Sequence, residues 1–371
     1  MKITPFKPAY PNLQKITTPE LFFERVKYEY AQQKKTGFFK TNIKSAFFVY
    51  QITRSWRTFT GLLAGADVED YLNNNIKKHE RTVAVGESRQ NNLLNEHGAA
   101  VKPILLAYTP VLEITDILTE YARANEPLIA VKMSGDEHLF WAITDAQKIA
   151  SLQKLFQEKV SDAYIADGHH RAHAYANAYL NLNKNVLNHP FEKLFCAFFP
   201  SDQLTINAFH RVITCEESLD KIEFWNKLLK IATVQFIGRS KMPMRKHDIS
   251  LFTAGRWVYL RWRKQILLQF QKDYPNKVLL DVHILNEKIL KPLFGITNVR
   301  TDERLTYVDG TKSNTDLEKA CPPYGAVFCM YPVDFKDFKR VSDTDGIMPP
   351  KSTFFEPRMK NGLIVYDFLY M

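Results

Sequence analysis

The residues of this chain that are best suited to chemistry lie close together, between Ala163 and Ala176. Ala163 to Ala166 has the apolar character of a short strand, and Asp167-Gly168 is typical of a tight turn. Apolar residues at helical spacing follow from Ala172 onward. The segment therefore predicts a strand, a turn and a helix, with His169 to Arg171 on the first turn of that helix.

Such a junction is suited to holding an anion, because free backbone N–H groups and the helix dipole both favour negative charge there. Gly168 would let a ligand approach the backbone, and His169, His170 and Arg171 would line it, Arg171 reaching two phosphate oxygens at once. Asp167 would cap the helix or help to hold a metal ion. The alternative is an ordinary capped helix whose histidines only pack. Three cationic or titratable side chains in succession count against it, since positive charge at a helix start is unfavourable without an anion.

A second candidate is His79-Glu80, which we expect at the end of a helix that begins after Asp67. A carboxylate near a phosphate loop could take the proton of a substrate hydroxyl, and such base catalysis contributes roughly 10² to 10⁴ in rate. His79 could orient Glu80 or contact the ligand. The alternative is a surface salt bridge between Glu80 and Lys78 or Arg81.

Lys351-Ser352-Thr353 is the third candidate, because a cation and two hydroxyls follow two prolines that stiffen the backbone. Such a group suits a phosphate or carboxylate, and we expect it to hold the anionic part of a substrate. The alternative is a chance tripeptide, since without glycines it is no Walker loop. His210-Arg211 is a weaker candidate of the same kind.

A metal ion could also bind near the turn. His169 and His173 are four residues apart and would share a helix face, with Asp167 just before them, so zinc or another transition metal could bind. The glutamate of an H-E-x-x-H motif is missing between the histidines. Magnesium with a nucleotide is the favoured prediction, because Asp167 can supply the carboxylate that Mg²⁺ needs beside a phosphate loop.

The segment Asp167-Gly168-His169-His170-Arg171 resembles the G-x-H-R phosphate-binding loop of the ParB/sulfiredoxin-like superfamily, which includes free-serine kinases. The wider chain is similar to the domain-of-unknown-function 1015 family over nearly its full length. The segments that carry this resemblance are Ile3 to Phe6, Lys78 to Thr82, Tyr164 to Arg171, His210-Arg211, Asp281 to Gly295 and Met348 to Pro357. The resemblance implies a ParB/sulfiredoxin-like core and nucleotide phosphates at the turn. The segment after Pro5 is shorter than is usual in the family.

The elements that must position these residues alternate between strand and helix. Paired strands are expected around Thr53 to Trp56, and hairpins over Pro127 to Ile143 and Asp248 to Trp262. Helices are expected after Thr18, after Asp145 and over Leu279 to Leu293, and Pro332 to Pro357 is expected to be a long loop. This order predicts a mixed α/β (α+β) fold with added sheet and helix elements. We expect two domains, a core over 1–220 with the phosphate loop and an α+β region over 221–371 with Lys351 to Thr353.

The composition narrows the class of protein. With 371 residues, 45% of them hydrophobic and 13% aromatic, the chain is globular rather than disordered. No apolar run is long enough to cross a bilayer, and the first ten residues lack the apolar stretch of a signal peptide, so we expect a cytoplasmic protein with no membrane partner. The net charge of +10 favours an anionic partner, but without a basic arm or a named motif nucleic acid is not expected.

These observations favour a nucleotide-binding, kinase-like phosphotransferase that acts on a small hydroxylated metabolite, with serine as the acceptor that the resemblance implies. Glu80 and His170 are the expected catalytic residues, and Mg²⁺ with ATP or ADP the expected cofactors. Two alternatives remain open. One is a ParB-type binding module that is switched by a nucleotide, and the other is a metal-dependent phosphoester hydrolase.

Overall fold

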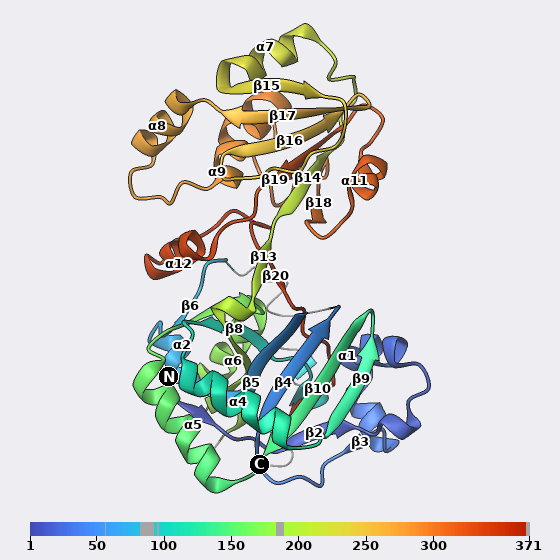
Figure 1. Ribbon diagram of the computed structural model, residues 1–371, viewed down its shortest axis with the longest axis vertical. Helices are drawn as coiled ribbons and strands as arrows, with labels where there is room; N and C mark the ends of the chain where they lie inside the picture. The colour runs from blue at the N-terminus through green and yellow to red at the C-terminus, as the bar shows by residue number, and fades with distance from the viewer. Residues whose placement is uncertain (56, 82–92, 95, 183–188, 369–371) are drawn as a thin grey trace. The chain divides into compact units, whose positions relative to one another are not determined.

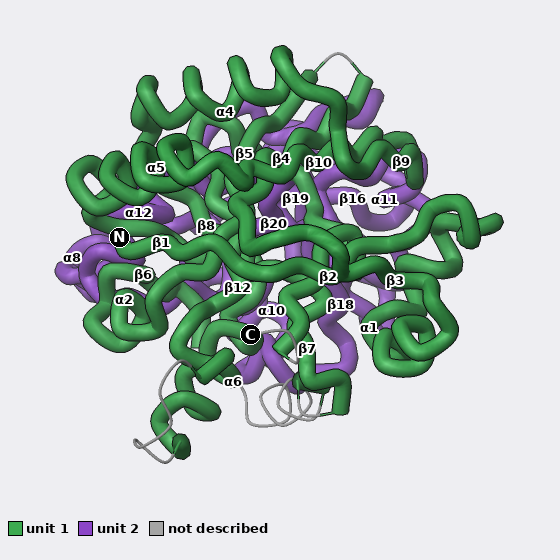
Figure 2. Tube along the Cα trace, turned by 90° about the horizontal axis from the view of Figure 1, so that it is seen from below, with its two compact units in different colours: residues 1–205, 357–371 green, residues 206–356 purple. Residues whose placement is uncertain are grey.

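The computed structural model of the chain describes residues 1–55, 57–81, 93–94, 96–182 and 189–368. These residues form two compact units, which Figure 2 colours separately. Unit 1 is Met1–Thr205 together with Pro357–Met371, and unit 2 is Ile206–Glu356. The chain thus leaves unit 1 after Thr205 and returns to it at Pro357. Whether 1–220 and 221–371 fold as separate domains stays a prediction.

A large mixed sheet forms the core of unit 1 (Figure 1). Most of its central strands are apolar on both faces, as in Lys193–Pro200, because helices cover the sheet on both sides. Its path runs β6 (Ile76–Lys77), β11 (Ala163–Asp167), β8 (Ile104–Tyr108), β12 (Lys193–Pro200), β5 (Arg57–Asp67), β4 (Phe47–Arg54), β10 (Asp136–Ile143) and β9 (Ile129–Met133), with β1 (Ile3–Thr4) paired to β5. The expected strand pair and the first hairpin are confirmed in β4–β5 and β9–β10.

In unit 1 the helices expected after Thr18 and after Asp145 begin where the sequence predicts, whereas α4 was not predicted. α4 and α5 lie on one face of the sheet and α6 on the other (Figures 1 and 2). Asp145 caps α5 by accepting a hydrogen bond from the Lys148 N–H at 2.8 Å. Their bounds are α1 (Pro19–Lys35), α2 (Val68–Leu72), α4 (Leu112–Ala124), α5 (Ala146–Lys159) and α6 (His169–Leu180). Among the described residues, no helix combines the length and apolar character needed to span a bilayer.

The expected helix between Asp67 and His79 is wrong in its extent. Asp67 caps α2, accepting from the Glu69 N–H at 3.0 Å, but α2 ends at Leu72. The Asn73-Asn74-Asn75 run stops it, since Asn74 adopts a left-handed conformation with φ +60°. The chain then enters strand β6, and His79-Glu80 follows that strand rather than a helix.

A second, smaller sheet of unit 1 joins distant parts of the chain. Its order is β3 (Phe39–Lys40), β2 (Pro8–Pro11), β21 (Val365–Asp367) and β7 (Ala99–Ala100). The buried Asp367 carboxylate accepts a hydrogen bond from the Tyr30 hydroxyl at 2.5 Å and pairs with Lys34 at 2.6 Å. The segment that returns from unit 2 is therefore fixed in unit 1 by backbone and side-chain bonds.

Unit 2 is built on a six-stranded sheet within the described residues. Its order is β15 (Ala232–Ile237), β17 (Arg256–Trp262), β16 (Asp248–Thr253), β19 (Ala326–Met330), β14 (Phe209–Ile213) and β18 (Leu305–Asp309). β13 (Thr205–Asn207) and β20 (Phe354–Glu356) form a separate two-stranded ladder. The helices are α7 (Ile222–Ile231), α8 (Lys264–Asp273), α9 (Asp281–Leu285), α10 (Lys291–Phe294), α11 (Asn314–Ala320) and α12 (Phe335–Asp343). The predicted mixed α+β class is confirmed, and a ParB/sulfiredoxin-like core stays a prediction.

Two expectations for unit 2 need correction. The segment Pro332 to Pro357 is no continuous loop, because Asp334 caps α12 and apolar residues at helical spacing, Phe338 and Val341, bury its inner face. The helix expected over Leu279 to Leu293 is interrupted by a wide π-type turn over Asn286–Leu290. Pro292 lies just beyond this turn and cannot donate to the regular helical bond pattern, which gives the turn a physical cause.

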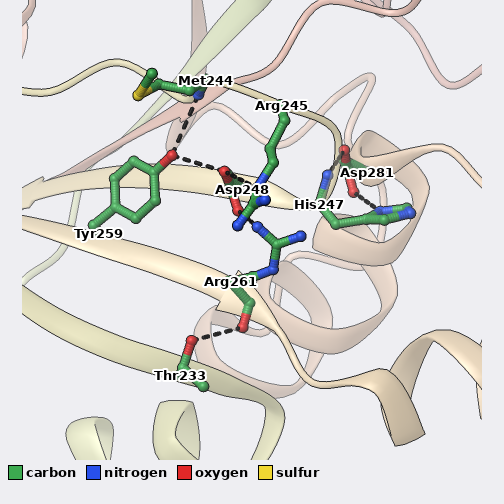
Figure 3. A network of polar contacts seen from close by, with 8 residues as sticks. All are labelled: Thr233, Met244, Arg245, His247, Asp248, Tyr259, Arg261 and Asp281. Atoms are coloured by element: carbon green, nitrogen blue, oxygen red, sulfur yellow. Dashed lines mark hydrogen bonds and ion pairs between the residues drawn. The ribbon is translucent and has the colours of Figure 1, made fainter.

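Asp248 and Asp281 organise a polar network at one end of β16 (Figure 3). The buried Asp248 carboxylate accepts from the Tyr259 hydroxyl and from Arg261, both at 2.8 Å. His247 has φ +75°, and both its backbone N–H and its ring Nδ1 lie 2.8 Å from the Asp281 carboxylate. These bonds stabilise a backbone conformation that a histidine seldom adopts.

Candidate functional site

Two parallel neighbouring strands bring the first two predicted segments together. β6 pairs with β11 in parallel, with Ala163 opposite Ile76, so the carboxyl ends of both strands lie at one edge of the sheet. His79-Glu80 leaves β6 at that edge, and Gly168 leaves β11. The ladder between β11 and β8 shifts register between Ile165 and Asp167, and such an irregularity commonly redirects a side chain beside a functional site.

The predicted strand, turn and helix are confirmed over 163–180. Gly168 is the N-cap of α6 with φ +106°, a conformation that residues with a Cβ rarely adopt. Gly168 has no side chain that could cap the first N–H groups of α6. A Cβ at position 168 would lie 2.6 Å from Arg171 Nη2. The glycine is therefore required for the Arg171 guanidinium to fold back over the turn, which the sequence did not indicate.

Asp167 lies among three cations. We call this group, which consists of Asp167, Lys102, Arg171 and Arg358, the anion cluster, after the anion that its cations would favour. Arg171 Nη2 donates to Asp167 Oδ2 at 3.0 Å. Lys102 Nζ lies 3.4 Å from Oδ2, and Arg358 Nη1 lies 3.5 Å from Oδ1. Burial alone would raise the pKa of Asp167, but the three cations outweigh it and hold that pKa far below its usual range. Asp167 is thus a carboxylate at any physiological pH.

The anion cluster carries more positive than negative charge. Among the described residues, Lys102 and Arg171 have Asp167 as their ion-pair partner, so two cations share one carboxylate before Arg358 is counted. Burial lowers the pKa of Lys102, although Asp167 opposes that shift. The N-terminus of α6 adds further positive potential. An anion at this place would relieve an electrostatic cost that the protein otherwise carries alone.

Sequence reasoning missed Lys102 and Arg358. Lys102 lies between β7 and β8, and β8 runs antiparallel to β11 with Leu105 opposite Asp167, so the start of β8 reaches the end of β11. Arg358 belongs to the segment that returns to unit 1 after unit 2. Neither residue lies in a motif, and only the strand pairing could have indicated Lys102.

A cavity of about 330 Å³ in unit 1 adjoins the anion cluster. Its polar lining residues are Lys27, His97, Lys102, Arg171, Tyr175 and Asn361. His97 is buried; its Nε2 lies 2.9 Å from the Lys27 carbonyl oxygen, while its Nδ1 has no hydrogen-bond partner among the described residues. A volume of this size is at the lower end of the range of small-molecule sites, about 300 to 1,000 Å³. Two cations of the anion cluster therefore line a space that can hold a small ligand.

His79, Glu80 and His169 form a second group, which we call the His-Glu cluster. His169 Nδ1 lies 3.8 Å from Glu80 Oε2, and the two imidazole rings stand nearly perpendicular with centroids 4.4 Å apart. Burial lowers the pKa of His169 to about 4 and the pKa of His79 well below its usual value. Both rings are therefore neutral at pH 7. Glu80 keeps 40% of its side chain exposed, which leaves it open to solvent or a ligand.

The remaining predicted residues of unit 1 are placed as follows. His170 is half-buried on the first turn of α6, and its Nδ1 has no hydrogen-bond partner among the described residues. His173 lies one turn further along the same helix. Among the described residues, the potential metal-ligand atoms that lie close together belong to the His-Glu cluster. That cluster includes neither Asp167 nor His173. Thr82, which contributed to the family resemblance, lies outside the described residues.

Lys351, Ser352 and Thr353 belong to unit 2. Ser352 is buried and its hydroxyl donates to the Pro349 carbonyl oxygen at 2.6 Å. Lys351 has φ +54°, and its Nζ lies 5.1 Å from the centroid of the Phe209 ring. Ser352 thus has a local structural bond, while a role of the tripeptide in holding a substrate stays a prediction.

His210 and Arg211, the weaker candidates, also have structural partners in unit 2. The buried Arg211 guanidinium donates to the carbonyl oxygens of Phe209 at 2.5 Å and Lys351 at 3.0 Å. His210 Nδ1 accepts from the Met330 N–H at 3.2 Å. The structure thereby brings two of the resembling segments together, since Arg211 fixes the backbone of Lys351.

The fold and these contacts describe a mixed α+β protein in which Lys102, Arg171 and Arg358 lie around Asp167 in unit 1. The chain belongs to the family described as a protein of unknown function, DUF1015, whose model matches residues 9–283. Ile3 to Phe6 and Met348 to Pro357, which contributed to the resemblance, lie outside that match. No curated protein matches the chain.

Solved structures show a distant likeness. A variant of a free serine kinase in complex with ADP is 12% identical, with a TM-score of 0.39 over 81% of this chain and 92% of that one. A free serine kinase in complex with AMP is 13% identical, with a TM-score of 0.39 and the same coverage. SbnI with a C-terminal truncation, from Staphylococcus aureus, is 11% identical with a TM-score of 0.38 over 81% of this chain and 87% of that one. Likenesses this distant assign no roles to residues of this chain.

Proposed function

We propose that this chain is a nucleotide-binding, kinase-like phosphotransferase that acts on a small hydroxylated metabolite, with serine as the first acceptor to test. The observation that carries the proposal is the anion cluster, in which Lys102, Arg171 and Arg358 lie around the carboxylate of Asp167 at the N-terminus of α6. A half-buried excess of positive charge favours a ligand with several negative oxygens, and a nucleotide phosphate is such a ligand.

Glu80 is the base that we assign. It lies beside His169, the first residue of α6, so it is at the same end of that helix as the anion cluster. In the proposed step the acceptor hydroxyl oxygen attacks the transferred phosphorus and its proton passes to Glu80. The bond between that phosphorus and the leaving oxygen of the nucleotide breaks, and the leaving oxygen keeps the electron pair. Positioning and charge stabilisation by Arg171 and Lys102 would supply most of the rate enhancement.

Mg²⁺ enters this proposal with ATP or ADP, bound to the phosphate oxygens of the nucleotide. Asp167 is a poor direct ligand for it, because its two oxygens already face Arg171, Lys102 and Arg358. A divalent cation at Asp167 would be repelled by those three charges. The proposed reaction therefore needs no metal ion on Asp167.

The first experiment is a thermal-shift titration of the whole chain with ATP, ADP, AMP and inorganic phosphate. We expect Arg171→Ala to weaken nucleotide binding by about 10- to 100-fold, because a hydrogen bond to a charged group contributes about 1.5 to 3 kcal/mol. Arg123→Ala is the matched control, since it removes the same charge from an exposed position on α4. Equal ligand shifts in wild type and in Arg171→Ala would refute the assignment of the anion site.

The second experiment measures transfer from ATP or ADP to serine. We expect Glu80→Gln to retain nucleotide binding and to lose at least about 100-fold in turnover, as expected when a general base is removed. Normal turnover in this variant would remove Glu80 from the mechanism. Nucleotide binding without any turnover in the wild type would instead favour the nucleotide-switched binding module.

A further inference from the structure

The His-Glu cluster has the composition of a metal site. Two imidazoles and one carboxylate are the donors of a common catalytic zinc site and of the two-histidine, one-carboxylate iron site. His79 and Glu80 lie two and three residues beyond the end of β6, and His169 is the first residue of α6. The parallel pairing of β6 with β11 brings both segments to one edge of the sheet, where the three donors converge.

The distances in the cluster suit a shared ion better than direct hydrogen bonding. The donor atoms of His79, Glu80 and His169 all lie within 4.8 Å of one another. Ligand atoms of a tetrahedral zinc ion, each about 2.1 Å from it, are about 3.4 Å apart. Side-chain shifts of about 1 Å would therefore close the set around an ion. The separation of 3.8 Å between His169 Nδ1 and Glu80 Oε2 is too long for a hydrogen bond, so the two groups converge without bonding.

The burial of His169 points in the same direction. Only 7% of this residue is exposed, and its Nε2, the ring nitrogen other than the one that lies 3.8 Å from Glu80, has no hydrogen-bond partner among the described residues. A buried ring nitrogen without a partner is costly unless a ligand or an ordered water completes it. The acid beside it, Glu80, is half-exposed and gives an ion access from solvent.

We infer that His79, Glu80 and His169 bind a divalent transition-metal ion, with zinc as the reference metal. Imidazole donors favour zinc, iron and similar ions over magnesium, which prefers oxygen donors. Three protein ligands leave at least one coordination position for water or for an anion oxygen. His169 directly follows Gly168, so that open position lies at the same end of α6 as the anion cluster.

This inference goes beyond the proposed phosphotransfer and does not depend on it. The two assignments compete for Glu80. Its carboxylate cannot accept a proton from an acceptor hydroxyl while it ligates an ion. Zinc in excess would therefore inhibit any transfer reaction that Glu80 supports. Metal binding itself can be measured without nucleotide or acceptor, so either proposal can fail while the other stands.

The test is a titration of the metal-free whole chain with Co²⁺, followed by its visible absorption, and a parallel calorimetric titration with Zn²⁺. We expect one ion per chain. Loss of a group that only supports a metal ligand typically weakens metal binding 10- to 100-fold. Glu80→Gln removes a direct ligand, so we expect it to weaken metal binding by about 100-fold or more.

His79→Ala should give the same loss, and Glu80→Gln keeps the test decisive if removing the buried His79 ring prevents folding. His173→Ala is the matched control, because His173 is on the same helix but outside the cluster. It should bind both metals as the wild type does. Absence of binding in the wild type, unchanged binding in Glu80→Gln, or a loss in His173→Ala would each overturn the assignment.

Discussion

Replacing Asp167 by Asn tests the electrostatic reasoning most directly, because it removes the negative charge and keeps the shape of the side chain. The change leaves Lys102, Arg171 and Arg358 without the carboxylate that they share. Removing one partner of a buried ion pair costs about 3 to 5 kcal/mol. The three cations keep between 20% and 37% of their side-chain surface exposed, so we expect the lower end of that range, about 3 kcal/mol.

For a unit of this size, about 3 kcal/mol corresponds to a fall in Tm of about 6 to 12 °C. The same change raises the net positive charge of the site by one, so Asp167→Asn should bind phosphate or ADP more tightly than the wild type does. A ligand at 100 times its Kd adds about 2.7 kcal/mol, which would restore most of the lost stability.

The assay is a thermal melt of wild type and Asp167→Asn over a phosphate and an ADP series at constant ionic strength. The reasoning predicts a low Tm without ligand and a larger gain with ligand in the variant. If Asp167 instead binds the ligand through a metal ion, the variant would lose affinity. A variant that responds less to phosphate than the wild type does would therefore refute the role of Asp167 as an internal counter-ion.

Two further outcomes are expected. Gly168→Ala should lower stability and weaken anion binding, because the new Cβ would displace the Arg171 guanidinium. Gly135→Ala is the control, because Gly135 has φ +80° and nothing lies near the position of its Cβ. In the same melts this control should lose only the conformational cost, about 1 to 2 kcal/mol. Burial lowers the pKa of His138 and of His210 to about 4, against about 6.5 in an unfolded chain, so the unfolded state binds more protons between these values. The free energy of unfolding should fall as pH drops from 6.5 to 4, by up to about 1.4 kcal/mol per pH unit for each histidine. Urea unfolding at several pH values measures this slope. Its absence would mean that the two rings are charged in the folded protein.

The local signals of the sequence predicted local structure well. The turn at Asp167-Gly168 and the caps at Asp145 and Asp67 depend on residues within one helical turn, and all of them form. The same reasoning failed where a competing local effect was overlooked. The asparagine run after Leu72 ends α2 early, and the cap at Asp334 begins a helix within the segment Pro332 to Pro357, which the sequence predicts as a loop.

The composition of the site was only partly accessible from the sequence. Arg171 and Asp167 lie four residues apart, so their pairing follows from helix geometry. Lys102 and Arg358 are far from them in the chain, and their contacts with Asp167 depend on strand pairing and on the return of the chain from unit 2. β6 has only two residues, too few for a periodic signal, yet it positions His79 and Glu80.

The return of the chain to unit 1 bears on how the protein is made. β21 joins β2 and β7, and Arg358 reaches Asp167, only after every residue of unit 2 has been synthesised. A nascent chain on the ribosome must therefore hold an unfinished unit 1, with Asp167 lacking the Arg358 contact, while unit 2 emerges. Unit 2 can collapse earlier, because its residues are contiguous, so the order of translation favours completion of unit 1 last.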